Sequence, residues 1–181
     1  MPGADRGYTA VAKILHWLTA LLVLGLICVG LWMVGLPIGF AKLYAYAWHK
    51  WIGLTVLVLS VLRLAWRVYR PPPGLPDTIT RWERAVAPWS HGLLLVLLLA
   101  LPVSGWLMSS AGGVSVVWFG ILPLPDLVPR DQALFEALRT AHYVLSRLLI
   151  AVLILHVTAV VHHDVLRRDG IFRRMWPFGG S

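Results

Sequence analysis

Four stretches of this chain are long and apolar enough to cross a lipid bilayer, and no other feature constrains its fold as strongly. They run approximately from Ile14 to Leu36, Tyr44 to Trp66, Ala85 to Met108 and Tyr143 to Val161. A helix needs roughly 20 mostly apolar residues to span a hydrocarbon layer of about 30 Å. Hydrophobic residues make up 59% of the sequence and charged residues 13%, so a water-soluble core could not bury the apolar surface. The sequence therefore predicts one all-α domain over residues 1–181, an integral membrane four-helix bundle.

Positive charge gathers on one side of the predicted bundle and sets its orientation. Eleven basic residues flank the helix ends on that side: Arg6, Lys13, Arg63, Arg67, Arg70, Arg81, Arg84, Arg167, Arg168, Arg173 and Arg174. The other side has only Lys42, Lys50, Arg130, Arg139 and Arg147. The positive-inside rule then places both termini in the cytoplasm. The net charge of +8 thus indicates contact with anionic lipid headgroups and not with nucleic acid.

The connections between the predicted helices are short or rich in proline and glycine. Arg70–Asp77 reads RPPPGLPD, which cannot be helical and predicts a cytoplasmic connector. Ser109–Thr140 predicts an outer loop, in which Asp131–Arg139 forms a short surface helix. The first apolar stretch follows basic residues, as a secretory signal does, but it is too long for a signal core and no cleavage site closes it. We therefore expect it to be a retained membrane helix.

Five of the seven histidines lie in the predicted spans or at their mouths, where ionisable side chains are costly and usually serve function: His16, His49, His91, His142 and His156. The first and third helices start inside, so His16 and His91 lie in the cytoplasmic half. The second helix starts outside and places His49 in the outer half. In the fourth helix His142 lies near the outer face, and His156, fourteen residues on, lies about 21 Å deeper on nearly the same helix face.

Two levels of imidazoles predict two stacked b-type haems. Each haem needs two axial imidazoles, supplied at matching depth by different helices. Depth pairs His49 with His142 at an outer haem. At the inner level His16, His91 and His156 compete, and depth does not choose two of the three. Because the sequence has no C-x-x-C-H, we expect the haems to be held by coordination alone.

The motifs around these histidines resemble those of the bacterial cytochrome b561 family, which is similar to the cytochrome b subunits of nickel hydrogenases and formate dehydrogenases. They are LHW at Leu15–Trp17, HKWIG at His49–Gly53, ALPVSGW at Ala100–Trp106, AHY at Ala141–Tyr143, LHVTAVVHH at Leu155–His163 and RRDGIFRRMWP at Arg167–Pro177. The resemblance covers nearly the whole chain, and the motifs are specific as a set.

The resemblance implies a complete set of haem ligands. In that family the fourth helix gives one ligand to each haem, the first helix gives the second inner ligand and the second helix gives the second outer ligand. The third helix gives none, so His91 becomes a neighbour of the haem or of the quinone. The implied metal ligands are His16 and His156 for the inner haem and His49 and His142 for the outer haem. His163 stands where relatives have a quinone-pocket histidine, and His162 stands where many of them have lysine.

Small free-standing members of that family resemble superoxide oxidases, and we expect the same function here. Superoxide would give its electron near the outer haem, and ubiquinone would be reduced near the inner haem. Basic residues on the outer side would steer the anion: Lys42, Lys50, Arg130 and Arg139. His163, with Asp164 and Asp169 nearby, would deliver protons to the quinone. The axial ligands do no acid or base catalysis, and no residue is assigned as catalytic.

Two other functions fit parts of the pattern. The bundle could be an electron-transfer anchor, a cytochrome b subunit that links a periplasmic dehydrogenase, hydrogenase or cytochrome c to the quinone pool. A metal transporter would use the histidines as transient ligands, but it predicts carboxylates near them and the four spans contain none.

Arg147 and three glycines in the predicted spans each have two possible roles. Arg147 lies on a different helix face from His142, where it either pairs with a haem propionate or extends to the membrane surface. Gly25, Gly53 and Gly105 allow the close approach either of a porphyrin or of a neighbouring helix.

Overall fold

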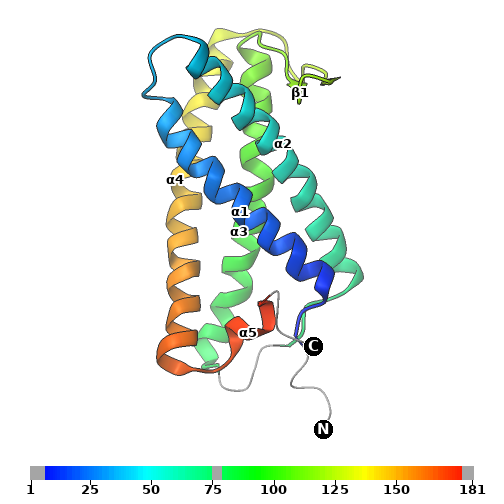
Figure 1. The fold of residues 1–181 in the computed structure, drawn as a ribbon, viewed down its shortest axis with the longest axis vertical. Coiled ribbons are helices and arrows are strands. Elements are labelled where there is room, and N and C mark those ends of the chain that lie inside the picture. The colour runs from blue at the N-terminus through cyan, green and yellow to red at the C-terminus, as the bar shows by residue number, and fades with distance from the viewer. Residues whose placement is uncertain (1–6, 75–78, 177–181) are drawn as a thin grey trace.

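Four long helices form the body of the molecule (Figure 1). A computed structural model describes residues 7–74 and 79–176. The long helices are α1 (Ala10–Met33), α2 (Phe40–Tyr69), α3 (Arg81–Ala111) and α4 (Gln132–Val161). Along the chain each packs on the next, α1 on α2, α2 on α3 and α3 on α4. All four are long and apolar enough to span a membrane, which confirms the predicted helical membrane bundle.

The bundle is apolar on its outer surface as well as inside, as a chain surrounded by lipid must be. Leu21 of α1 is 65% exposed and Leu155 of α4 is 68% exposed. The buried core draws on all four helices and consists of Val23, Val56, Leu97, Leu98, Leu101 and Leu149. In α4 the core residue Leu149 lies midway along the chain between His142 and His156. A layer of apolar side chains therefore separates the two histidine levels.

The helices are longer than predicted, and the largest difference is at the start of α4. The separate surface helix predicted at Asp131–Arg139 is wrong, because these residues cap and begin α4 itself. The Asp131 side chain accepts a hydrogen bond from the Leu134 backbone N–H at 2.9 Å. No proline or glycine follows before Tyr143, so the helix continues into the membrane. The connector is non-helical from Arg70 to Gly74, and the rest of the predicted Arg70–Asp77 segment lies outside the described residues.

The loop between α3 and α4 folds into a small antiparallel hairpin, β1 (Val117–Trp118) with β2 (Leu122–Pro123). Indole groups attach this hairpin to α2. Trp51 Nε1 donates to the Val117 carbonyl at 2.6 Å, and Trp118 Nε1 donates to the Trp51 carbonyl at 3.1 Å. These hydrogen bonds hold the hairpin over one end of the bundle.

The chain returns to the opposite end of the bundle after α4. A π-helical turn, η1 (His162–Arg167), is followed by the short helix α5 (Ile171–Met175). Trp17 Nε1 of α1 donates to the Met175 carbonyl at 2.8 Å. The beginning of α1 and the last described segment therefore lie together at one end of the molecule (Figure 1).

Candidate haem-binding sites

The outer histidine pair lies between α2 and α4. The ring centroids of His49 and His142 are 6.4 Å apart, and the ring planes make an angle of 74°. Because bonds between a metal and an imidazole nitrogen are about 2 Å long, this separation leaves room for one iron between the rings. The structure thus brings together the two residues that were predicted to share a depth.

Hydrogen bonds around the outer pair leave nitrogen atoms available to a metal. Ser104 Oγ of α3 lies 2.9 Å from His142 Nδ1 and donates its own proton to the Leu101 carbonyl at 2.8 Å. A hydroxyl has one proton, so His142 Nδ1–H must be the donor to Ser104, and His142 Nε2 keeps a free lone pair. His49 Nδ1 is buried without a hydrogen-bond partner among the described residues. Both observations fit a haem bound between these rings.

Two glycines lie against the outer rings. A Cβ atom at Gly30 of α1 would come within 3.2 Å of His49 Cε1, and one at Gly105 of α3 would come within 3.4 Å of His142 Cε1. Of the glycines singled out in the sequence, Gly25 and Gly53 have open space at that position. Gly30 was missed, because its role depends on how α1 is rotated against α2, which one sequence does not reveal.

The inner level contains three histidines from three helices. The rings of His91 (α3) and His156 (α4) have centroids 5.5 Å apart and planes at 72°. His16 (α1) lies within electrostatic range of both. The structure therefore assembles all three competing residues at one level, and the ring that contacts His156 belongs to His91.

Arg63 of α2 occupies the remaining side of the inner level. Its NH2 group lies 3.2 Å from His16 Nδ1. A guanidinium can only donate, so His16 Nδ1 is the acceptor, and in this neutral ring the proton is on Nε2. Iron binding through Nε2 would require the tautomer that carries the proton on Nδ1, and Arg63 would then have to give up this hydrogen bond.

A cluster of ionisable side chains surrounds His163 at the cytoplasmic end of the predicted topology. His163 Nδ1 lies 2.5 Å from Asp169 Oδ2, and His163 Nε2 lies 3.9 Å from Glu83 Oε1. Glu83 also accepts from Arg167 at 3.1 Å and from the Thr80 backbone N–H at 2.9 Å, the latter forming the capping box of α3. The π-helical turn thus holds His163 between two carboxylates from different segments.

Glu83 was not anticipated in this cluster, although a Thr-x-x-Glu pattern before an apolar run is a readable cap signal. Asp164, which was expected beside His163, is exposed. His162 is also exposed, with its ring centroid 5.7 Å from that of His163. The carboxylates that contact His163 are therefore those of Asp169 and Glu83.

The outer basic residues have different roles in the structure. Lys42 Nζ donates to the Leu36 carbonyl at 2.9 Å and so binds the end of α1. Arg139 forms an exposed ion pair with Glu136 at 2.6 Å. Lys50 Nζ donates to Ser109 Oγ at 2.9 Å. The guanidinium carbon of Arg147 lies 4.9 Å from the centroid of the Tyr143 ring, and the Arg147 side chain is exposed. Of the two predicted arrangements, this favours extension to the membrane surface over pairing with a haem propionate.

Comparison with known proteins identifies the family to which this helical bundle belongs. A family model described as prokaryotic cytochrome b561 matches residues 7–178. The chain is 30% identical over 175 residues to cytochrome b561 homolog 2 of Escherichia coli strain K12, with 93% of this chain and 90% of that protein aligned. It is 26% identical over 176 residues to a Yersinia pestis protein named probable superoxide oxidase CybB, with 95% and 97% aligned. Because the family match spans almost the entire sequence, this chain is a multi-pass bacterial membrane protein of the prokaryotic cytochrome b561 family, whose cofactor is b-type haem.

Proposed function

We propose that this protein carries electrons across the bacterial inner membrane through two b-type haems, oxidising superoxide at the outer face and reducing ubiquinone at the cytoplasmic face. One observation carries the proposal: histidines gather at two levels of a single bundle, with an apolar core between them. One level would suffice for chemistry on one face. Two levels suit transfer between faces, and a relative named as a probable superoxide oxidase supports the choice of donor.

The residues present fit two haems. His49 and His142 would hold the outer group, and His16 and His156 the inner group. Each haem, when bound, supplies a one-electron carrier whose potential is set by its axial ligands and surroundings. Ser104 fixes the orientation of His142 through its Nδ1 proton. Leu97, Leu101 and Leu149 exclude water from the layer between the two levels.

The overall reaction needs protons at only one face. Two superoxide anions lose one electron each and leave as two molecules of dioxygen. One ubiquinone takes up both electrons and two protons to become ubiquinol. The cluster of ionisable side chains formed by His163, Asp169 and Glu83 lies at the end of the bundle where His16 and His156 lie and away from the outer pair. This position suits proton delivery to a quinone.

Pulsed superoxide tests the proposal on purified protein in detergent with a soluble ubiquinone. We expect the haem absorbance to show rapid reduction after each pulse, followed by reoxidation as ubiquinol forms, with two superoxide ions consumed per ubiquinol. If superoxide leaves the haems oxidised while a co-purifying dehydrogenase reduces them, the protein is an electron-transfer anchor subunit instead.

A further inference from the structure

Lys50 is a half-buried ammonium group whose hydrogen-bonding capacity is mostly unused. Its Nζ donates to Ser109 Oγ at 2.9 Å, and Ser109 Oγ in turn donates a hydrogen bond to the Val114 carbonyl at 2.6 Å. No acidic side chain of residues 7–74 and 79–176 forms an ion pair with Lys50. An ammonium group has three protons to donate, and leaving a charge partly desolvated without a counter-charge is costly. The position therefore favours the arrival of an anion.

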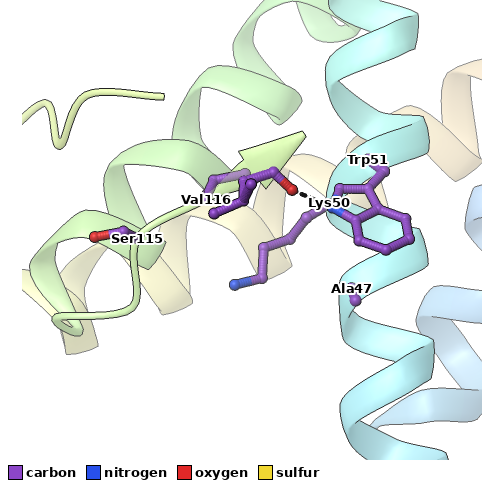
Figure 2. A pocket seen from close by; sticks show the side chains of 6 residues that line it. Ala47, Lys50, Trp51, Ser115 and Val116 are labelled. Carbon is purple, nitrogen blue, oxygen red and sulfur yellow. Dashed lines mark hydrogen bonds between the residues drawn. The ribbon is translucent and has the colours of Figure 1, made fainter. Parts of the chain in front are cut away.

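A cavity of about 170 Å³ lies beside this ammonium group. Its walls are Ala47, Lys50 and Trp51 of α2 and the segment from Ser115 to Val117. Figure 2 shows the Lys50 side chain reaching from α2 towards the loop that carries Ser115 and Val116. A water molecule occupies about 30 Å³ in the liquid, so the cavity admits a diatomic or triatomic anion with a few waters but no organic cofactor.

The cavity is held open by fixed groups. The hydrogen bond from Trp51 Nε1 to the Val117 carbonyl, drawn in Figure 2, joins the helix wall to the hairpin wall. A second hydrogen bond, from Trp118 Nε1 of β1 to the Trp51 carbonyl of α2, also holds the hairpin against the helix. One carboxylate lies near the rim, since Asp126 accepts from Ser115 Oγ at 2.9 Å. The hydrogen bond from Ser115 and the exposure of Asp126 to solvent reduce the repulsion that this carboxylate exerts on an anion in the cavity.

Lys50 directly follows His49 in α2, so the cavity adjoins the outer histidine pair. Consecutive residues of a helix point about 100° apart, and here His49 is beside His142 of α4 while Lys50 is beside Ser109 of α3. An anion next to the ammonium group would lie close to the outer haem without displacing either axial ligand.

We propose that Lys50 and this cavity form a binding site for a small inorganic monoanion, and that superoxide is the anion that reacts there. The identity of the anion rests on the proposed function, whereas the site rests on the cavity and the uncompensated charge. The lysine holds the anion while its electron passes to the outer haem, and neutral dioxygen, which the ammonium group does not attract, leaves.

Two measurements test the site on the haem-loaded protein. The first is the second-order rate of haem reduction by pulsed superoxide, with bromide as an inert competitor. The second is the anomalous scattering of bromide in crystals. In the wild type we expect a bromide peak within hydrogen-bonding distance of Lys50 Nζ and slower haem reduction as bromide is added.

Four variants separate the charge from the cavity. Lys50→Met should lose the bromide peak and react about tenfold more slowly or worse, whereas Lys50→Arg should retain much of the rate. Ala47→Leu fills the cavity but keeps the charge, and should also slow the reaction. Arg173→Gln is the charge control, because it removes an exposed positive charge from α5 at the opposite end of the bundle, and it should change the rate less than twofold.

The outcomes distinguish this site from the proposed function. Equal superoxide rates in wild type and Lys50→Met, with no bromide peak at Nζ, would overturn the anion site and leave superoxide oxidation intact. A bromide peak in a protein whose haems superoxide does not reduce would support the site and overturn the proposed function. Correct haem content in each variant shows that the fold is retained.

Discussion

At the scale of single residues, the hydrogen bonds of each imidazole decide how readily it can bind iron. His142 is prepared for coordination, because its Nδ1–H donates to Ser104 Oγ and its Nε2 keeps a free lone pair. His16 is not prepared in the same way, because the Arg63 guanidinium occupies its Nδ1. In the proposed set of ligands, the outer pair already has a suitable arrangement, whereas haem binding by His16 would require its hydrogen bond with Arg63 to change.

Replacing either outer histidine by alanine should remove one haem and retain the other. His49→Ala and His142→Ala each leave one axial position empty at the outer level, and the inner level lies across the apolar core. Pyridine haemochrome quantification should give close to one haem per protein in both variants. His162→Ala, which changes an exposed histidine, should retain both haems. Loss of both haems from His49→Ala alone would mean that the two levels do not bind independently.

The inner ligands can be identified by the same measurement on three further variants. Resemblance to the family assigns His16 and His156, so His16→Ala and His156→Ala should each lose the inner haem, while His91→Ala should retain both. The structure makes this a demanding test, since the ring of His91 lies beside that of His156. If His91→Ala loses a haem and His16→Ala keeps two, α3 supplies the inner ligand and Arg63 keeps its bond to His16.

At the scale of the helices, Gly30 of α1 leaves space for the His49 ring of α2. The His49 ring lies against this residue so closely that a Cβ would be 3.2 Å from its Cε1 atom. All four helices therefore shape the outer site: α2 and α4 give the imidazoles, α3 gives Ser104 and Gly105, and α1 leaves space for the His49 ring.

A larger side chain at Gly30 should damage the outer site selectively. Gly30→Leu must displace the His49 ring or push α1 away, and overpacking of this kind typically costs about 1–3 kcal/mol. We expect outer haem occupancy to fall, seen as a haem-to-protein ratio near one, and the melting temperature to drop. Cys28→Leu is the matched control on the same helix, because the Cys28 side chain is exposed, so both haems should remain. Equal haem loss in the two variants would show that the effect is not local to His49.

At the scale of the whole molecule, a bilayer makes some features predictable and leaves others open. Four helices and two histidine levels could be predicted, because hydrocarbon thickness fixes span length and helix rise fixes depth. Depth is a single coordinate, however, and the choice among His16, His91 and His156 depends on the rotation of each helix about its axis. The start of α4 and the contact of Glu83 with His163 were missed for a similar reason, since they depend on caps and on segments that meet only in the fold.

The order of electron transfer follows from the separation of the two levels and can be tested by removing one level at a time. In His156→Ala, superoxide should still reduce the remaining outer haem, but ubiquinone reduction should be almost entirely lost, because about 21 Å of helix rise separates the two levels and the inner haem would no longer bridge them. In His49→Ala the pattern should reverse: ubiquinol should reduce the inner haem, and superoxide should not. Stopped-flow absorbance at the haem bands, with each reductant supplied separately, measures both halves. Ubiquinone reduction at the wild-type rate in His156→Ala would mean that both substrates react at the outer level and that the bundle does not carry electrons between its faces.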